Sequence, residues 1–277
     1  MKNGIPFVAS YHTDFPSYLQ HYGLRFLSLE KGLWSYLRWF HKESRINFCP
    51  SESTRKELQN KGFSHLEIWG RGICTETFSP DFKSPVTAKK HGLEGKDIIL
   101  LYVGRLAREK EIGVLLDAVR TLQKKNISLR LLLVGDGPER KKIVASAPPE
   151  VVCTGYQTGK ELSRLYAEAD IFAFPSSTET FGNVILEAMA SGVPAVAPRG
   201  GGVRENIVHN ENGRFFAAGD AEDMARSLEI LIRNESLRQE LGKKAREFTL
   251  QKSWEAVLNR LLSRYTDIIA PKRQVSA

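Results

Sequence analysis

The stretch IILLYVGRLAREKEIGVLLDAVRTLQKKNISLRLLLV, residues 98–134, decides the fold class of this protein. Two strand-length apolar runs, 98–103 and 129–134, flank the helix-length segment 111–125. Parallel strands that are buried on both faces have such nearly continuous apolar runs, because helices cover the sheet on either side. The stretch therefore predicts a strand–helix–strand unit of a doubly wound α/β sheet.

The same alternation continues on the C-terminal side of this unit. Further β-rich runs follow, and segments of helical length such as 159–169 separate them. These runs are residues 150–154, 170–175, 194–198 and 213–216. After residue 216 the patterns are helical. We therefore expect a complete α/β domain over residues 83–252, followed by a C-terminal helix over 253–277 that packs back toward the N-terminal domain.

The N-terminal part of the chain has the pattern of a second α/β domain with fewer strands. We expect strands over residues 6–12, 45–51 and 65–70, and helices over residues 29–45 and 52–62. These strands are too few to close a sheet comfortably, so we interpret residues 1–82 as an incomplete domain. The stretch 79–92, rich in Pro, Lys and Ser, breaks the periodicity and predicts the linker between the domains.

Composition and charge restrict the class of protein. The chain has 277 residues, of which 42% are hydrophobic and 26% charged, which is the balance of a globular soluble protein. The apolar runs are shorter than the ~20 residues of a membrane span, and the start lacks a secretory signal pattern, so we expect a cytoplasmic protein. The formal charge of +8 indicates an anionic partner without choosing among nucleic acid, anionic lipid and phosphorylated small molecules. Cys49, Cys74 and Cys153 have the spacing of neither a disulfide framework nor a metal site, and we expect free thiols.

Charged residues follow the strands of the predicted C-terminal domain. Ligands of open parallel sheets bind beyond the carboxyl ends of the strands. Arg105 and Lys110 follow the first strand of this domain, and the stretch PSSTETFGN, residues 175–183, follows the fourth. We therefore expect these cations and this stretch to lie on one rim of the sheet.

The stretch TETFGNVILEAMASG, residues 178–192, places Glu179 and Glu187 on either side of Gly182. If a helix starts near Gly182 or Asn183, its free N–H groups and positive dipole end form an anion site. A phosphate there would lie between two carboxylates, which bind vicinal hydroxyls well. A sugar, a diphosphate and a ribose in that order make a nucleotide sugar. Each residue singly could be an ordinary surface charge or helix residue, but their combination on successive strand ends favours the nucleotide-sugar site.

Three stretches with these residues resemble a known family. They are YVGRLAREKEIGVLLDAV (102–119), LLVGDGPER (132–140) and YAEADIFAFPSSTETFGNVILEAMASGVPAVAP (166–198). They resemble the donor-binding half of the retaining glycosyltransferases of family 4, which have the GT-B fold. SYHTDFPSY (10–18) and WSYLRWFHK (34–42) look like the branch of lipid-linked mannosyl- and sulfoquinovosyltransferases. The resemblance implies one complete Rossmann-like donor domain and an incomplete Rossmann-like acceptor domain.

The resemblance also implies donor-binding roles. Glu179 would contact the donor sugar as a catalytic residue, and Glu187 would contact the ribose. The side chains of Arg105 and Lys110 would bind the diphosphate. The helix start formed by Gly182, Asn183 and Val184 would bind it as well. No cluster with the spacing of metal ligands is visible in the sequence, so we expect no metal cofactor, and the two cations would stabilise the leaving diphosphate.

On the acceptor side, the resemblance implies that His12 faces the reaction centre, with Asp14 and Tyr18 beside it. His12 ends a predicted strand, where a base or hydrogen-bond donor could reach a cleft. Cys74 stands where the family has aspartate, and Glu111 where a glycine commonly follows the lysine. Relatives also carry further N-terminal strands and a glycine-rich loop, so we expect that this chain is truncated.

We therefore expect a glycosyltransferase that moves a hexosyl group from GDP-mannose or a UDP-sugar to a lipid or glycan acceptor, with retention of configuration. Nucleic acid is not an expected partner. Two alternatives are a nucleotide-sugar epimerase of similar fold and a non-catalytic nucleotide-binding fragment.

The amphipathic pattern of helix 29–45 predicts that the protein contacts the inner face of an anionic membrane. Its core-facing stripe is expected to comprise Leu29, Leu33, Tyr36, Leu37 and Phe40. The opposite, basic side is expected to comprise Lys31, Arg38, His41, Lys42 and Arg45, with Trp34 and Trp39 on the flanks. A solvated basic surface without a lipid partner is the alternative.

Overall fold

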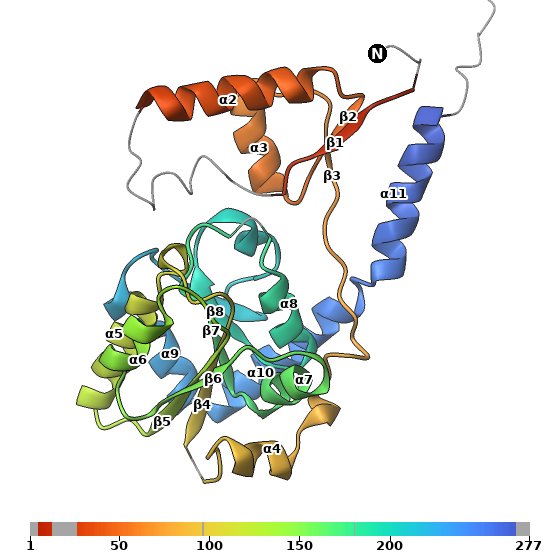
Figure 1. Ribbon diagram of the computed structural model, residues 1–277. Helices are drawn as coiled ribbons and strands as arrows, with labels where there is room; N and C mark the ends of the chain where they lie inside the picture. The colour runs from red at the N-terminus through yellow and green to blue at the C-terminus, as the bar shows by residue number, and fades with distance from the viewer. Residues whose placement is uncertain (1–4, 13–26, 96, 180, 270–277) are drawn as a thin grey trace, which may run out of the picture. The chain divides into compact units, whose positions relative to one another are not determined.

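The computed structural model describes residues 5–12, 27–95, 97–179 and 181–269 (Figure 1). These residues form two compact units. Unit 1 consists of the residues up to Gly72 together with those from Lys252 onward, and unit 2 runs from Ile73 to Gln251. Each unit has its own parallel sheet between helices, which confirms the predicted α/β class.

Unit 2 contains a six-stranded parallel sheet in the order β6-β5-β4-β7-β8-β9. The strands are β4 (Ile98–Val103), β5 (Leu129–Val134), β6 (Val151–Gly155), β7 (Ile171–Ala173), β8 (Ala195–Pro198) and β9 (Gly213–Phe216). The α-helices are α4 (Pro85–Lys90), α5 (Ile112–Lys124), α6 (Arg140–Ser146), α7 (Gly159–Glu168), α8 (Asn183–Ala190), α9 (Ala221–Arg233) and α10 (Glu235–Leu250). The strands predicted for this domain are all present.

The core of unit 2 explains why its central strands have continuous apolar sequences. Leu100 and Leu101 of β4, with Leu131 and Leu132 of β5, are completely buried although they point alternately to opposite faces. Helices therefore cover both faces of the sheet, as they do in other sheets with parallel strands.

The strand order reverses between β4 and β7. From β4 the chain proceeds outward through β5 to β6, and it then returns to the other side of β4 to form β7, β8 and β9. In open parallel sheets, ligands bind beyond the carboxyl ends of the strands at such a reversal. The segments that leave β4 and β7 at this point are residues 104–111 and 174–182.

The segment expected to be an inter-domain linker, residues 79–92, is part of unit 2 instead. It forms a 3-10 helix (Pro80–Phe82) and α4, and both pack against α7. Just before it, the ring of Phe78 lies edge-on to Tyr166, with 5.4 Å between the ring centroids. The boundary between the units therefore falls after Gly72 rather than after residue 82.

Unit 1 contains a three-stranded parallel sheet in the order β1-β2-β3. The strands are β1 (Val8–Ser10), β2 (Ile46–Cys49) and β3 (Leu66–Ile68), and the helices are α2 (Leu27–Lys42), α3 (Glu52–Asn60) and α11 (Trp254–Ile269). Only the central strand β2 is buried along its whole length. The described part of the chain contains no helix with the length and apolar character of a membrane span.

The C-terminal helix α11 completes the core of unit 1. Leu261 packs with Ile46 and Phe48 of β2. Arg264 donates hydrogen bonds to Glu67 of β3, one of them 2.8 Å long, across 197 positions of sequence. The N-terminal sheet is therefore stabilised by residues from the far end of the chain.

The buried face of α2 differs from the predicted one. Tyr36 and Phe40, expected to face the core, are 58% and 42% exposed, whereas Trp34 and His41 are buried. The cause is the buried Asn47 of β2, whose Oδ1 accepts a hydrogen bond from His41 Nδ1 at 2.8 Å. A buried amide requires polar partners, so His41 faces the core, and Tyr36 and Phe40 turn outward. The side chain of Leu29 lies outside the described residues.

Candidate functional site

The segment after β4 presents Arg105 and Lys110. The hydroxyl of Tyr102 donates a hydrogen bond to the backbone oxygen of Arg105 at 3.1 Å, which fixes the start of the segment. The exposed guanidinium of Arg105 forms an ion pair with the buried carboxylate of Glu109. Lys110 ends the short 3-10 helix Arg108–Lys110.

Glu111, at a position where the family resemblance leads us to expect glycine, adopts a left-handed backbone conformation with φ of +52°. Glycine adopts this conformation without strain, which explains the usual residue. Here the Glu111 carboxylate accepts a hydrogen bond from Ser177 N at 2.8 Å. The substitution therefore fastens the segment after β4 to the segment after β7.

Further hydrogen bonds hold the segment 174–182 in place. Ser176 Oγ donates to the backbone oxygen of Glu109 at 3.2 Å. On the other side, Gly202 N donates to Glu179 O at 3.0 Å, and Asn206 Nδ2 donates to Phe181 O at 2.7 Å. The segment that carries Glu179 is thus fixed by its neighbours on both sides.

Helix α8 begins where the sequence predicted it. Gly182 precedes the helix with φ of +82°, which favours glycine, and Asn183 and Val184 form the first turn. The first N–H groups of any helix lack partners within the helix, and they point out of its N-terminus. The rim therefore contains a site with partial positive charge.

Lys110 and Glu179 are brought together by the two segments. The Nζ of Lys110 lies 2.9 Å from Glu179 Oε2, and the two side chains are only 16% and 20% exposed. Lys110 Nζ also lies over the ring of Phe174, 6.0 Å from its centroid. In this structure the cation expected to bind phosphate is neutralised by the carboxylate expected to bind sugar.

Glu187 lies one turn into α8, and its Oε2 accepts a hydrogen bond from the hydroxyl of Tyr166 at 2.7 Å. Burial raises the pKa of the Glu187 carboxyl, while the hydrogen bond from Tyr166 acts in the opposite direction. Burial and the nearby carboxylate raise the pKa of Tyr166 well above its usual value, so this residue keeps its proton. No sequence pattern indicates this contact, because α7 and α8 bring together residues 21 positions apart.

His12, in unit 1, follows β1. Its Nε2 lies 2.7 Å from Ser10 Oγ, and its ring is edge-on to Trp69. Burial, followed by the charge of Arg71, lowers the pKa of His12, which favours the neutral imidazole. Asp14 and Tyr18, expected on the acceptor side, lie outside the described residues.

Cys74, at a position where the family resemblance leads us to expect aspartate, is exposed and acts as a hydrogen-bond acceptor. The hydroxyl of Thr77 donates to its Sγ at 3.0 Å. This bond, together with backbone hydrogen bonds from Thr77 and Glu76, lowers the pKa of the thiol. The thiol thus takes a position in which a carboxylate would accept the same bonds.

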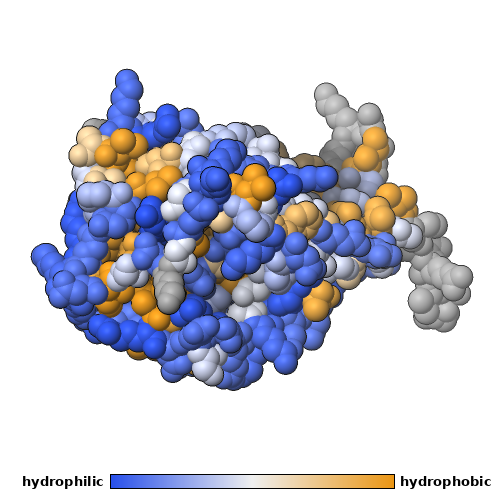
Figure 2. All heavy atoms as spheres, turned by 90° about the horizontal axis from the view of Figure 1, so that it is seen from below, coloured by the Kyte–Doolittle hydropathy of each residue, from blue (hydrophilic) through white to orange (hydrophobic). Residues whose placement is uncertain are grey.

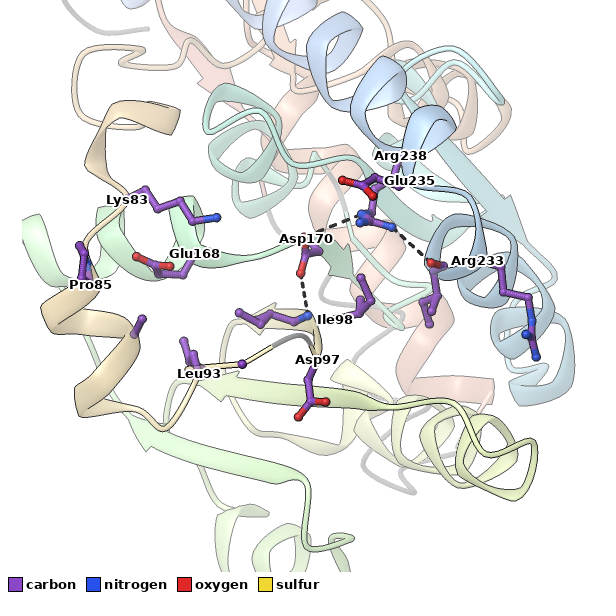
Figure 3. A pocket seen from close by; sticks show the side chains of 14 residues that line it. Lys83, Pro85, Leu93, Asp97, Ile98, Glu168, Asp170, Arg233, Glu235 and Arg238 are labelled. Atoms are coloured by element: carbon purple, nitrogen blue, oxygen red, sulfur yellow. Dashed lines mark hydrogen bonds and ion pairs between the residues drawn. The ribbon is translucent and has the colours of Figure 1, made fainter.

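A cavity of about 830 Å³ lies at the opposite end of the unit 2 sheet, beside the starts of β4 and β7 (Figure 3). Asp170 there accepts a hydrogen bond from Ile99 N at 2.9 Å and lies 3.8 Å from Arg238. Glu168 accepts one from Ser84 N. These polar groups serve the protein's own structure. Figure 2 views the molecule from below, and most of the surface seen there is hydrophilic. We therefore take the rim, and not this cavity, as the candidate site.

Among the described residues, no group of three or more His, Cys, Asp or Glu side chains is placed to hold a metal ion. The charged side chains that meet on the rim of unit 2 are Arg105, Glu109, Lys110, Glu111 and Glu179. The rim therefore combines two cations, a helix N-terminus and carboxylates.

Comparisons with known proteins identify the family and the fold of this chain. Residues 84–248 match the family described as glycosyl transferases group 1, and residues 1–77 match glycosyltransferase family 4. The sulfoquinovosyl transferase SQD2 of Arabidopsis thaliana is 34% identical over 93% of this chain and 51% of its own length. A GDP-mannose-dependent alpha-mannosyltransferase of Mycobacterium tuberculosis is 34% identical over 95% of this chain and 66% of its own length. The chain thus spans about half to two thirds of these curated relatives.

Two solved structures show the same fold. Anabaena Alr3699/HepE in complex with UDP and glucose has a TM-score of 0.76 at 20% identity, over 95% of this chain and 71% of that one. Sucrose-phosphate synthase from Thermosynechococcus elongatus has a TM-score of 0.82 at 22% identity, over 96% of this chain and 69% of that one.

Proposed function

This chain belongs to glycosyltransferase family 4, and from that membership we propose that it transfers a hexosyl group from a nucleotide diphosphate sugar to an acceptor with retention of configuration. The observation that carries the proposal is the rim at the strand-order reversal of unit 2. Lys110 and Glu179 meet there beside the start of α8, and the side chain of Glu179 packs against Gly182. The donor is a UDP- or GDP-sugar, since relatives are named for GDP-mannose and a structure of the same fold is a complex with UDP.

Each donor group has a matching part of the rim. Arg105 and Lys110 neutralise the diphosphate, together with the N–H groups of Asn183 and Val184 at the start of α8. Glu179 accepts hydrogen bonds from hydroxyls of the transferred sugar, and Glu187 from those of the ribose. For the donor to bind, Lys110 must exchange Glu179 for phosphate, which frees the carboxylate for the sugar.

In the reaction, the bond between the anomeric carbon and the diphosphate oxygen breaks, and a bond to the acceptor oxygen forms on the same face. In a front-face reaction the departing phosphate oxygen takes the proton of the acceptor hydroxyl. In a two-step reaction a carboxylate bonds to the anomeric carbon first, and the acceptor then displaces it. In both routes the rim stabilises the negative charge of the leaving diphosphate.

We also propose that donor binding requires no divalent metal, because two side-chain cations and a helix N-terminus would together neutralise the diphosphate. Calorimetry with UDP and GDP in the presence of EDTA or of magnesium should give the same affinity. A strong dependence on magnesium would contradict this proposal.

For the acceptor we propose a lipid at an anionic membrane surface. The support comes from α2, where Tyr36 and Trp39 are exposed by 58% and 68% and their rings lie 5.8 Å apart. Lys31 and Lys42 on the same helix are exposed cations. Exposed aromatic rings with flanking cations suit the interface of a bilayer with acidic headgroups.

The test of the lipid proposal is co-sedimentation with anionic and with zwitterionic vesicles, with and without added salt. Binding should require anionic lipid and weaken with salt. Tyr36→Ser with Trp39→Ser should abolish it. Arg38 is left unchanged, because it donates hydrogen bonds to Lys61 O and Ser35 within unit 1. A wild type that stays in the supernatant with anionic vesicles at low salt would favour a soluble glycan acceptor.

The test of the reaction is product analysis by NMR after incubation with a UDP- or GDP-hexose and lipid acceptors. A new α-linkage from an α-configured donor supports retaining transfer. An epimerised nucleotide sugar without transfer would support the epimerase, and donor binding with neither product would support a nucleotide-binding fragment.

A further inference from the structure

We propose that Tyr166 is a positioning residue of the donor site, whose hydroxyl fixes one oxygen of Glu187 so that the other oxygen is presented to the ribose. This inference rests on the proposed function, because it assumes that unit 2 binds a nucleotide.

The contact between Tyr166 and Glu187 has the geometry of a strong, charge-assisted hydrogen bond. The hydroxyl lies 2.7 Å from Glu187 Oε2 and joins α7 to α8. Tyr166 has no exposed surface, whereas Glu187 is half-buried. The hydroxyl is therefore a donor from inside the protein, and Glu187 is the member of the pair that a ligand can reach.

Aromatic packing fixes the Tyr166 ring. Its centroid lies 5.9 Å from that of Phe172 in β7 and 5.4 Å from that of Phe78, which is edge-on to it. Since both neighbours are apolar, a rotated ring would bury an unpaired hydroxyl, which is costly. The orientation of the hydroxyl is thus determined by the core.

The position of Glu187 on α8 directs its carboxylate toward the donor. Side chains of an α-helix lean toward its N-terminus, and Glu187 lies one turn after the helix start at Gly182. With Oε2 held by Tyr166, Oε1 is available to accept from the ribose hydroxyls.

The same contact favours the ionised form of Glu187. Burial raises the pKa of this carboxyl, and the hydrogen bond from Tyr166 lowers it. A diol that donates hydrogen bonds needs the carboxylate, so ribose affinity is present above the Glu187 pKa and is lost as the pH falls through it. Removal of the hydroxyl raises that pKa, so the loss should begin at a higher pH.

The experiment is calorimetry of wild type and Tyr166→Phe with UDP and GDP and with their 2′,3′-dideoxy forms. We expect Tyr166→Phe to weaken ribonucleotide binding about tenfold, the lower range for a hydrogen bond to a charged group. Binding of the dideoxy forms should not change. On acidification, ribonucleotide affinity should fall at a higher pH in Tyr166→Phe than in wild type.

The control is Ser163→Ala, which removes another buried hydroxyl from α7, one that donates to Gly159 O at 3.2 Å. It should leave both nucleotide series and the pH profile unchanged. In a Glu187→Gln background, Tyr166→Phe should have no further effect on the discrimination between ribose and dideoxyribose.

The outcomes separate this inference from the proposed function. A wild type that binds no nucleotide contradicts the proposed donor site itself. Equal losses for ribose and dideoxyribose in Tyr166→Phe, or a fall of affinity at an unchanged pH, would show that Tyr166 is only part of the core. If Tyr166→Phe does not fold, the same calorimetry on wild type and Glu187→Gln tests the inference. Ribose discrimination that is independent of pH in wild type, or that persists in Glu187→Gln, overturns the inference.

Discussion

Unit 1 and unit 2 are both parallel α/β structures, but they differ in how their cores are completed. The sheet of unit 2 has six strands, its longest strands have six residues, and its core is formed within Ile73–Gln251. The sheet of unit 1 has three strands of three or four residues, and its core includes Leu261 from the other end of the chain. Stability and donor binding should therefore respond to different mutations, and the four tryptophans make this testable.

All four tryptophans, Trp34, Trp39, Trp69 and Trp254, belong to unit 1. Tryptophan fluorescence therefore follows the unfolding of unit 1, while far-UV circular dichroism is dominated by the larger unit 2. We predict that Leu261→Ala lowers the free energy of unfolding of unit 1 by about 2–4 kcal/mol, because it leaves a cavity against Ile46 and Phe48.

In a urea titration of Leu261→Ala, the fluorescence midpoint should fall while the main dichroism transition stays in place. Leu258→Ala is the matched control, since Leu258 on the same helix is 44% exposed. A common shift of both signals would show that the two units unfold as one.

Donor binding, in contrast, should depend on residues of unit 2 and not on the stability of unit 1. Glu187→Ala is predicted to weaken UDP or GDP binding by about 1.5–3 kcal/mol, the range for hydrogen bonds to charged groups. Calorimetry measures the loss, and the tryptophan transition should not move. Unchanged affinity would remove the ribose role of Glu187.

The ion pair between Lys110 and Glu179 predicts a smaller effect of opposite sign. Glu179→Gln should strengthen binding of the bare nucleotide about two- to fivefold, because Lys110 no longer exchanges a carboxylate for phosphate. Under the proposed role of Glu179 in binding the transferred sugar, turnover should fall, and the family resemblance predicts the same for His12→Ala. Glu240→Gln, which breaks an exposed pair with Lys244, is the control. Weaker nucleotide binding by Glu179→Gln would show that Glu179 assists the nucleotide rather than competing for Lys110.

The smallest effect concerns the cysteines of unit 2. The hydrogen bond from Thr77 lowers the pKa of Cys74, whereas burial raises that of Cys153. Near pH 7 the Cys74 thiolate is the more populated, so iodoacetamide should modify Cys74 several times faster. Peptide mass spectrometry measures the rates. Thr77→Val should reduce the difference, and equal rates in wild type would contradict the assigned hydrogen bonding.

The sequence predicted the parts of the molecule whose patterns are local. The strands of unit 2 and the start of α8 at Gly182 follow from apolar runs and a glycine. The segment 79–92 was misread as a linker because proline marks loops and also first helical turns, and Pro80 and Pro85 open short helices here.

The remaining errors and omissions arise from contacts between distant residues. The buried face of α2 depends on Asn47, an amide in a strand that the helix covers. The contact of Tyr166 with Glu187 joins two helices that β7 separates in the sequence. No residue spacing within one element could therefore predict it. The pairing of Lys110 with Glu179 was not predicted either, although both were assigned to one rim.

The packing of α11 on β2 has a consequence for biosynthesis. The strands of unit 1 leave the ribosome first, but Leu261 is made 189 residues after the boundary at Gly72 (261 − 72). At about 5–20 residues per second, unit 1 waits roughly 10–40 s for its last core helix. During that time unit 2 is translated, while Ile46 and Phe48 of β2 lack their partner Leu261. The part of the protein that is translated first is therefore expected to become native last.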